Sequence, residues 1–355
     1  MNPVSNVSDA LPRTDRGPRS NPAVARDRRG PGHTARRVLG HEQFGILVVL
    51  LVLVGLIGGF HPNFLTVDSL LGLVRSSAFV AIVAFGMVFL IAMRELDLSV
   101  GAIFGLSALA SAQLMASGMS PWLGLIVGPL FGALLGAVNG VVSNTFRIPV
   151  IIVTLGTLTL FRGVAVVATD SKAVQGIPLD DTFFQVMGNS VLGIPVSVIA
   201  VVIIGVALTV VFTRTPFGAR VRAIGSNESA ARFSGIRVNR TRMQVLVLVG
   251  ALCGLSGVLS LAYFQGADAT IGTGLELQVI AAAIIGGTAI SGGTGSVPGA
   301  LIGALVISAI SSGLVYFSIG PTWSGVVTGG TVVVAVSADG YLRRRRAQQL
   351  ARSEG

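Results

Sequence analysis

Residues 72–117 read GLVRSSAFVAIVAFGMVFLIAM (72–93), RELDL (94–98) and SVGAIFGLSALASAQLMAS (99–117). Two apolar runs therefore flank a short turn that contains Arg94, Glu95 and Asp97. Each run matches the length of roughly 20 residues that an α-helix needs to cross the hydrocarbon core of a bilayer. This stretch predicts two membrane-spanning helices joined by a charged turn.

The rest of the chain repeats this alternation of long apolar runs and short polar segments. Of its 355 residues, 52% are hydrophobic and 11% are charged, and the mean hydropathy is +0.81. A soluble globule must cover itself with polar groups, so this composition excludes soluble, disordered and disulfide-stapled proteins. The single cysteine, Cys253, can form no intrachain bridge. We predict an all-α, polytopic membrane helical bundle of about ten transmembrane helices. The predicted spans are 44–60, 72–93, 99–117, 121–143, 149–168, 193–212, 244–263, 276–291, 297–317 and 321–338.

The charged residues divide the chain into a membrane domain and two tails. Residues 1–43 carry 12 charges and few large apolar side chains, which predicts a disordered Arg-rich tail. Residues 339–355 form a second Arg-rich tail, and residues 44–338 form the transmembrane domain, which includes a polar loop at 213–242. The first apolar run is followed by His61-Pro62-Asn63 instead of a small-residue cleavage site, so we interpret it as a retained span.

The basic residues predict the orientation of the chain in the membrane. Ten spans place both termini on one side, and 22 of the 25 Lys and Arg residues then lie on that side. Arg75 and Lys172 face the other side, and Arg162 lies within a span. The positive-inside rule predicts that both tails and the 213–242 loop are cytoplasmic. The net charge of +10 is then a topology signal in a multi-pass protein of the cytoplasmic membrane, in contact with lipid. The arginines gather in the two tails and one loop, where the positive-inside rule explains them, so we expect no nucleic-acid partner.

The sequence offers no means of using ATP or a metal ion. A phosphate-binding P-loop needs Gly-Lys followed by Ser or Thr, but the only lysine lies in Ser171-Lys172-Ala173. His33, His41 and His61 are scattered, and no Cys-x-x-Cys occurs. We therefore predict that the chain is not an enzyme and binds no cofactor.

The first polar segment that could carry function is the turn at residues 93–101. Asp97 and Ser99 stand just before an apolar run, where they are predicted to cap the next helix. Two interpretations remain open: a capped cytoplasmic turn with an ion pair, and a turn with a gating or coupling role.

The second polar segment is the 213–242 loop. Ser226 or Asn227 is predicted to cap a short helix that runs to Phe233, and Gly235 is predicted to end it. A short amphipathic helix outside the membrane is typical of a docking element for a partner. The alternative is that its arginines contact lipid headgroups.

The third polar segment, residues 265–278, leads into a span. It contains the candidate substrate-path residues Gln265, Thr273, Glu276 and Gln278, and Arg162 is the candidate counter-ion of Glu276. Carboxylates at membrane depth are functional candidates. The alternatives are a helix cap for Glu276 and a structural ion pair for Arg162.

In their order and spacing, these three segments resemble the permease subunit of bacterial ribose/xylose/arabinose-type ABC sugar importers. The family's Gly-Ile-Asp-Leu-Ser-Val-Gly element corresponds to residues 95–101, its Gly-Asn-Glu-x-Ala element corresponds to 226–230, and the Gly-Ile pair that follows corresponds to 235–236. Its Gly-Thr-Gly-x-Glu-Leu and Gly-Gly-Thr elements correspond to 272–277 and 286–288. The chain departs from the family at Arg94-Glu95, which replaces a small neutral pair, at Ser226, where Gly is usual, and at Gln278, where Asp is common.

The resemblance implies a permease that imports a pentose or hexose and takes its energy from a separate subunit. A separate cytoplasmic ATP-binding subunit uses the ATP, an extracytoplasmic sugar-binding protein delivers the cargo, and two permease copies form a homodimer. The segment 218–236 resembles the coupling helix that contacts the ATPase. The coupling candidates are Gly218, Arg222, Asn227, Glu228, Arg232 and Gly235.

Two other functions remain as alternatives. A related ABC permease for nucleosides or branched-chain amino acids would share the architecture. A gradient-driven secondary transporter usually places ionisable residues near the bilayer midplane, and here only Arg162 looks deep.

Overall fold

The computed structural model describes residues 42–320 continuously, together with isolated positions between 323 and 337. The predicted tenth span, 321–338, and both predicted tails lie outside the continuous part, except for Glu42 and Gln43 at the start of the first helix.

Each of the first nine predicted spans contains an α-helix. Six helical stretches are long and apolar enough to cross a membrane, within the part of the chain that the structure describes. They are α3 (Val67–Ala92), η2 with α5 (Pro121–Leu123 and Gly124–Phe146), α6 (Val150–Thr169), α8 (Val196–Arg214), α11 (Val238–Phe264) and α13 (Val297–Tyr316). The shorter apolar helices are α2 (Glu42–Phe60), α4 (Val100–Ala116) and α12 (Leu275–Ile285), and η1 (Pro62–Leu65) joins α2 to α3. The all-α, polytopic prediction is confirmed at this level.

The predicted span at 276–291 is wrong in its extent. Helix α12 ends at Ile285, because the chain turns at Gly286 and then at Gly287, whose φ of 90° is left-handed. With 11 residues, α12 covers about 16 Å, roughly half of the hydrocarbon thickness. Helix α12 is therefore too short to cross the bilayer alone, and the loops at its two ends must span the remaining thickness.

Helix α11 packs along α5 through glycines on both helices. A side chain at Gly132 or Gly136 of α5, or at Gly250 or Gly254 of α11, would collide with the backbone of the other helix. Lipid tails are as apolar as leucine, so helices in a membrane associate by this kind of close backbone contact. The Gly-x-x-x-Gly spacing in the sequence thus marks a real helix–helix contact.

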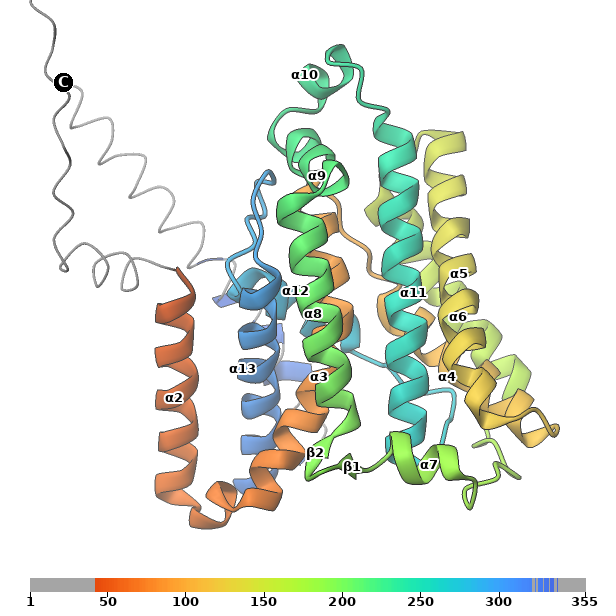
Figure 1. Ribbon diagram of the computed structural model, residues 1–355, viewed down its shortest axis with the longest axis vertical. Coiled ribbons are helices and arrows are strands. Elements are labelled where there is room, and N and C mark those ends of the chain that lie inside the picture. Colours follow the sequence, from red (N-terminus) through yellow and green to blue (C-terminus); the bar gives the residue numbers. More distant parts are fainter. Residues whose placement is uncertain are drawn as a thin grey trace, which may run out of the picture. The chain divides into compact units, whose positions relative to one another are not determined.

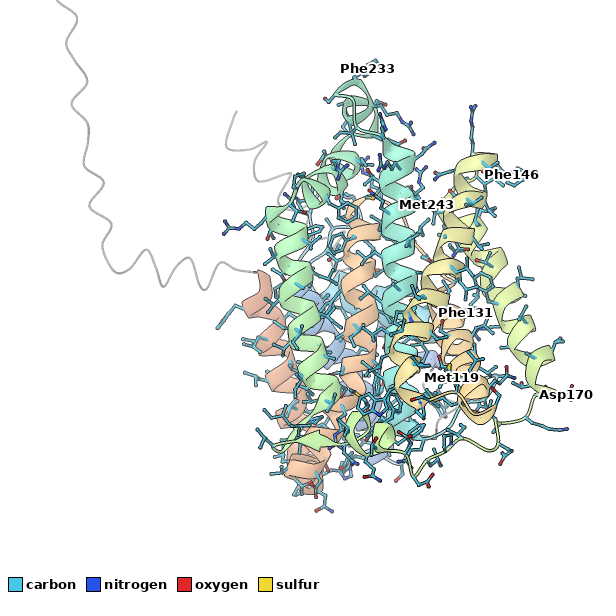
Figure 2. All side chains as sticks on the ribbon, turned by 45° about the vertical axis from the view of Figure 1, so that its right-hand side comes forward. Met119, Phe131, Phe146, Asp170, Phe233 and Met243 are labelled. Atoms are coloured by element: carbon cyan, nitrogen blue, oxygen red, sulfur yellow. The ribbon has the colours of Figure 1, made fainter. Side chains whose placement is uncertain are left out.

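Short elements occupy the two ends of the helical body (Figure 1). Helices α9 (Pro216–Ser226) and α10 (Glu228–Phe233) lie at one end, called here the coupling-loop end. At the opposite end, the hairpin end, α7 (Thr182–Met187) precedes the strands β1 (Ser190–Val191) and β2 (Ile194–Pro195). The two strands pair antiparallel, with Ser190 opposite Pro195. Figure 2 shows Phe233 and Phe146 toward the coupling-loop end and Asp170 toward the hairpin end.

Candidate functional site

The predicted helix in the 213–242 loop is present as α10. The Asn227 side chain caps it by accepting a hydrogen bond from the Ala230 backbone N–H at 3.0 Å. Gly235 follows the helix with a left-handed φ of 81°, which favours glycine, so the predicted end is confirmed. Sequence reasoning missed the preceding helix α9, although Thr215-Pro216 is a typical helix start: the Thr215 hydroxyl accepts from Gly218 N.

Two of the coupling candidates serve to hold α9 against α8. Arg222 donates to the backbone carbonyl of Phe212, and its guanidinium lies 5.3 Å from the centre of the Phe212 ring. A side chain at Gly218 would collide with the same carbonyl. Arg222 and Gly218 therefore face the protein, whereas Glu228 and Arg232 of α10 are exposed.

Helix α10 presents a charged and aromatic surface away from the helical body. Glu228 and Arg232 form an ion pair at 2.6 Å, and both side chains are about half exposed. Phe233 is 94% exposed and lies at the tip of the coupling-loop end (Figure 2). An exposed aromatic side chain next to paired charges is typical of a surface that packs into a partner.

The turn between α3 and α4 is buried at Asp97 and Ser99, whereas Arg94 is exposed. Asp97 and Ser99 have no exposed surface. The Asp97 carboxylate accepts from the Ser99 backbone N–H at 2.7 Å and from its hydroxyl at 2.6 Å, and Asn139 donates to the Ser99 hydroxyl at 2.8 Å. The prediction that the Ser99 side chain caps α4 is wrong, because its hydroxyl is used by Asp97 and Asn139.

Burial changes the acidity of Asp97. This residue lies outside the spanning helices, and burial raises its pKa to about 6 against the lowering effect of the Ser99 hydrogen bonds. Its second oxygen, Oδ2, and Asn139 Oδ1 are both buried without a partner among the described residues. A proton on Asp97 would let this carboxyl donate as well as accept.

Glu95 forms an ion pair, but its partner lies on α11 and not in the turn itself. Its carboxylate accepts from Arg242 Nε of α11 at 2.6 Å, and both side chains are mostly buried. Burial raises the pKa of Glu95, and the Arg242 guanidinium partly opposes this change. Arg94 instead donates to the backbone carbonyls of Ser291, at 2.6 Å, and Ser226, at 3.1 Å. The turn thus ties α3 to α11, to α9 and to the loop after α12.

The Arg162–Glu276 pair exists. Arg162 Nη2 lies 3.3 Å from Glu276 Oε2 and 3.4 Å from Oε1, and Arg162 Nη1 donates to the Thr273 hydroxyl at 3.2 Å. The Glu276 side chain is 13% exposed and that of Arg162 is 31% exposed. Three of the five substrate-path candidates are therefore in one cluster.

The other two candidates stand apart from this cluster. Gln265 is exposed at the end of α11, where it takes a left-handed φ of 55°. Gln278 is half-buried on α12. Neither side chain makes a hydrogen bond to any residue that the structure describes. No contact assigns them a role.

The cluster lies where two short helices meet inside the membrane domain. A side chain at Gly101, in the first turn of α4, would collide with Glu276 and with the Gly272 carbonyl, and one at Gly105 would collide with the Ile271 carbonyl. The loop before α12 therefore packs on the first turns of α4. Short helices that end inside the membrane are where transporters commonly bind their cargo.

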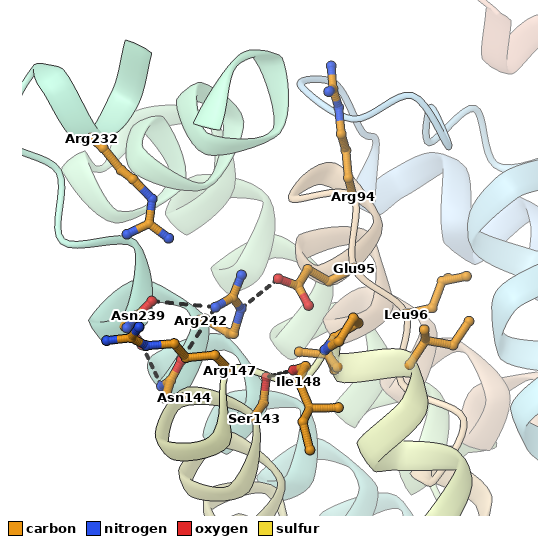
Figure 3. Close-up of a pocket in the computed structure, with 13 residues that line it drawn as sticks. Arg94, Glu95, Leu96, Ser143, Asn144, Arg147, Ile148, Arg232, Asn239 and Arg242 are labelled. Atoms are coloured by element: carbon orange, nitrogen blue, oxygen red, sulfur yellow. Dashed lines mark hydrogen bonds and ion pairs between the residues drawn. The ribbon is translucent and has the colours of Figure 1, made fainter. Parts of the chain in front are cut away.

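A cavity of about 660 Å³ opens at the coupling-loop end (Figure 3). Its lining comes from the turn after α3, the end of α5, the start of α6, α10 and the start of α11. The charged residues in the lining are Arg94, Glu95, Arg147, Arg232 and Arg242. Sequence analysis did not find this cavity, because its residues are far apart in the chain. Within the described residues, no group of three or more His, Cys, Asp or Glu side chains could hold a metal ion.

The comparisons with known proteins match permease components of transport systems. Residues 69–336 match the family described as branched-chain amino acid transport system / permease component. The chain is 39% identical to the ribose import permease protein of Bacillus subtilis (strain 168), over 84% of this chain and 92% of the relative. It is 36% identical to the D-allose transport system permease protein of Escherichia coli (strain K12), over 84% of this chain and 91% of that protein. It is 32% identical to an L-arabinose ABC transporter permease protein of Azospirillum brasilense, over 85% and 88% of the two chains. No solved structure matches the chain.

Proposed function

Because this chain belongs to the family of branched-chain amino acid transport system permease components, it is a transporter subunit and not an enzyme, and we propose that its cargo is a monosaccharide. The observation that carries the proposal is the likeness, over more than four-fifths of the chain, to permeases named for ribose, allose and arabinose. The protein is a multi-pass component of the cytoplasmic membrane, in line with its six long apolar helices among the described residues.

The orientation proposed here has ten spans, with both tails and the coupling-loop end in the cytoplasm. It is supported by the 22 basic residues on that side. Labelling of Asn227→Cys in a Cys253→Ser background tests it. An impermeant thiol reagent added to intact cells should leave this cysteine unlabelled, and labelling from outside would refute the orientation.

The membership of this family implies an ATPase and a substrate-binding protein as partners. ATP would be used by the ATPase, and a homodimer of the permease would form the path. The exposed surface of α10, with Glu228 and Phe233, is the proposed contact with the ATPase at the coupling-loop end, and Arg232 is the neighbour that pairs with Glu228. Asn227 and Gly235 would hold the two ends of this helix, and Arg222 and Gly218 would hold α9 so that movement reaches α8.

The proposed substrate path passes the Arg162–Thr273–Glu276 cluster. A neutral sugar is bound through hydrogen bonds and needs no fixed charge of either sign. A paired arginine and glutamate can provide such hydrogen bonds while their charges cancel. Gln265 and Gln278 remain proposals for the outer part of the path, as does a gating role for Asp97 and Ser99 in the turn before α4.

The test is uptake into proteoliposomes that contain this permease, its ATPase and its binding protein. Labelled ribose, allose and arabinose are compared with leucine and a nucleoside. ATP-dependent uptake of at least one sugar supports the proposal. Uptake of leucine or the nucleoside alone, or uptake that follows an ion gradient without ATP, would refute it.

A further inference from the structure

The cavity at the coupling-loop end carries an excess of positive charge. Four arginines and one glutamate line it, which leaves a formal charge of +3. Neither the cluster at Glu276 nor the exposed surface of α10 accounts for so many cations around a cavity of about 660 Å³. Like charges that share a partly enclosed space repel each other, so they are most stable with an anion between them.

Two of the four arginines already have strong partners. Arg242 is paired with Glu95 at 2.6 Å, and Arg94 donates to the carbonyls of Ser291 and Ser226. Arg232 has only the half-exposed pair with Glu228, and its side chain reaches from α10 toward Arg242 (Figure 3). Arg147 forms no ion pair with any described residue. Arg147 and Arg232 are therefore the cations available to a ligand.

The start of α6 adds hydrogen-bond donors to the same cavity. Pro149, Val150 and Ile151 line it. The first N–H groups of a helix have no partner within the helix, and they lie at the positive end of its dipole. Proline at the N-cap has no side chain that could accept from them. These N–H groups complement a phosphate oxygen, as helix N-termini do in many anion sites.

One wall of the cavity is apolar and continues onto the surface of a spanning helix. Ile148 and Ile151 line the cavity and are 37% and 42% exposed. Further along α6, Ile152 and Leu155 are more than half exposed. A free phosphate would use only the charged part of this surface, whereas a phospholipid would use both parts.

We propose that this cavity binds the phosphate headgroup of an anionic phospholipid. Arg147, Arg232 and the α6 N-terminus contact the phosphate, and the acyl chains lie along the exposed face of α6. Basic pockets between spanning helices are a known form of lipid recognition. The proposal does not depend on which cargo the protein carries.

The experiment is native mass spectrometry of the purified full-length chain, titrated with phosphatidylglycerol or with phosphatidylcholine of the same acyl chains. Arg147→Gln and Arg232→Gln are compared with Arg240→Gln, an exposed arginine at the same end that does not line the cavity. We expect phosphatidylglycerol to be retained in preference to phosphatidylcholine. Each cavity variant should weaken its binding by about fivefold, as expected for one basic residue near an anionic lipid, and Arg240→Gln should change it less than twofold.

Any one of four outcomes would overturn the proposal. Equal retention of the two lipids, or equal effects of all three variants, would mean that the cavity does not recognise the headgroup. Retention of inorganic phosphate at millimolar concentration, with loss of the bound lipid, would identify free phosphate as the ligand. If the ATPase displaces the lipid, and Arg147→Gln weakens binding of the ATPase instead of binding of the lipid, the surface belongs to the protein partner. Slow reaction of the buried Cys253 with a thiol dye checks that each variant is folded.

Discussion

Replacing Glu276 with alanine tests the buried cluster most directly. The change removes both acceptors of the Arg162 Nη2 group and leaves a guanidinium that is only 31% exposed. Breaking a fully buried ion pair costs about 3–5 kcal/mol, and breaking an exposed pair costs less than about 1 kcal/mol. The partial exposure of Arg162 places the expected loss of unfolding free energy between these limits, at about 2 kcal/mol.

Cys253 provides the assay for this loss. It is the single cysteine of the chain and is fully buried, so a thiol-reactive fluorescent dye reports unfolding. Glu276→Ala should lower the unfolding temperature by a few degrees. It should also slow sugar uptake into proteoliposomes at saturating binding protein and ATP, while the sugar affinity of the binding protein stays unchanged.

Gln278→Ala is the matched control, because Gln278 lies on the same short helix and its side chain makes no hydrogen bond with the described residues. We expect it to lower transport less and to leave the unfolding temperature nearly unchanged. Parental stability and transport in Glu276→Ala would refute the reasoning. If Arg162→Ala combined with Glu276→Ala restores transport, the pair is structural and does not bind the cargo.

Three further predictions concern the other parts of the site. Glu228→Lys should abolish uptake and ATPase co-purification. It should change the unfolding free energy by less than about 0.5 kcal/mol, because the exposed pair with Arg232 is weak. Normal uptake would contradict the docking role of α10. In the parent protein, the pKa of Asp97 is about 6 when the chain is folded, against the ordinary value of 3.8, so the folded state binds more protons than the unfolded state. The stability of the parent should therefore fall as the pH rises from 4 to 7, and Asp97→Asn should remove this pH dependence. Equal pH profiles of thermal unfolding for the two proteins would refute this. Gly101→Ala should reduce transport and stability, because its methyl group would collide with Glu276 and the Gly272 carbonyl, and a parental unfolding temperature would show that the loop before α12 yields.

Helix positions and the capped helix α10 could be predicted from the sequence, because both depend on neighbours in the chain. Spans follow from runs of apolar residues, since every backbone polar group in lipid must be satisfied within its own helix. The same holds for Asn227 and Gly235, whose effects reach only a few residues along the chain. The early end of α12 was missed, because Ala289 and Ile290 continue the apolar pattern beyond the two glycines that break the helix.

Contacts between distant segments had no such local signal. Arg162 and Glu276 could be suggested as partners only because each charge was unusual in its own segment, and only the fold shows that Arg162 also donates to Thr273. The burial of Asp97, the inward direction of Arg222 and the basic cavity around Arg147 depend on which helices pack together. That packing is decided by small residues such as Gly132 and Gly250, whose spacing marks a contact surface but does not name its partner.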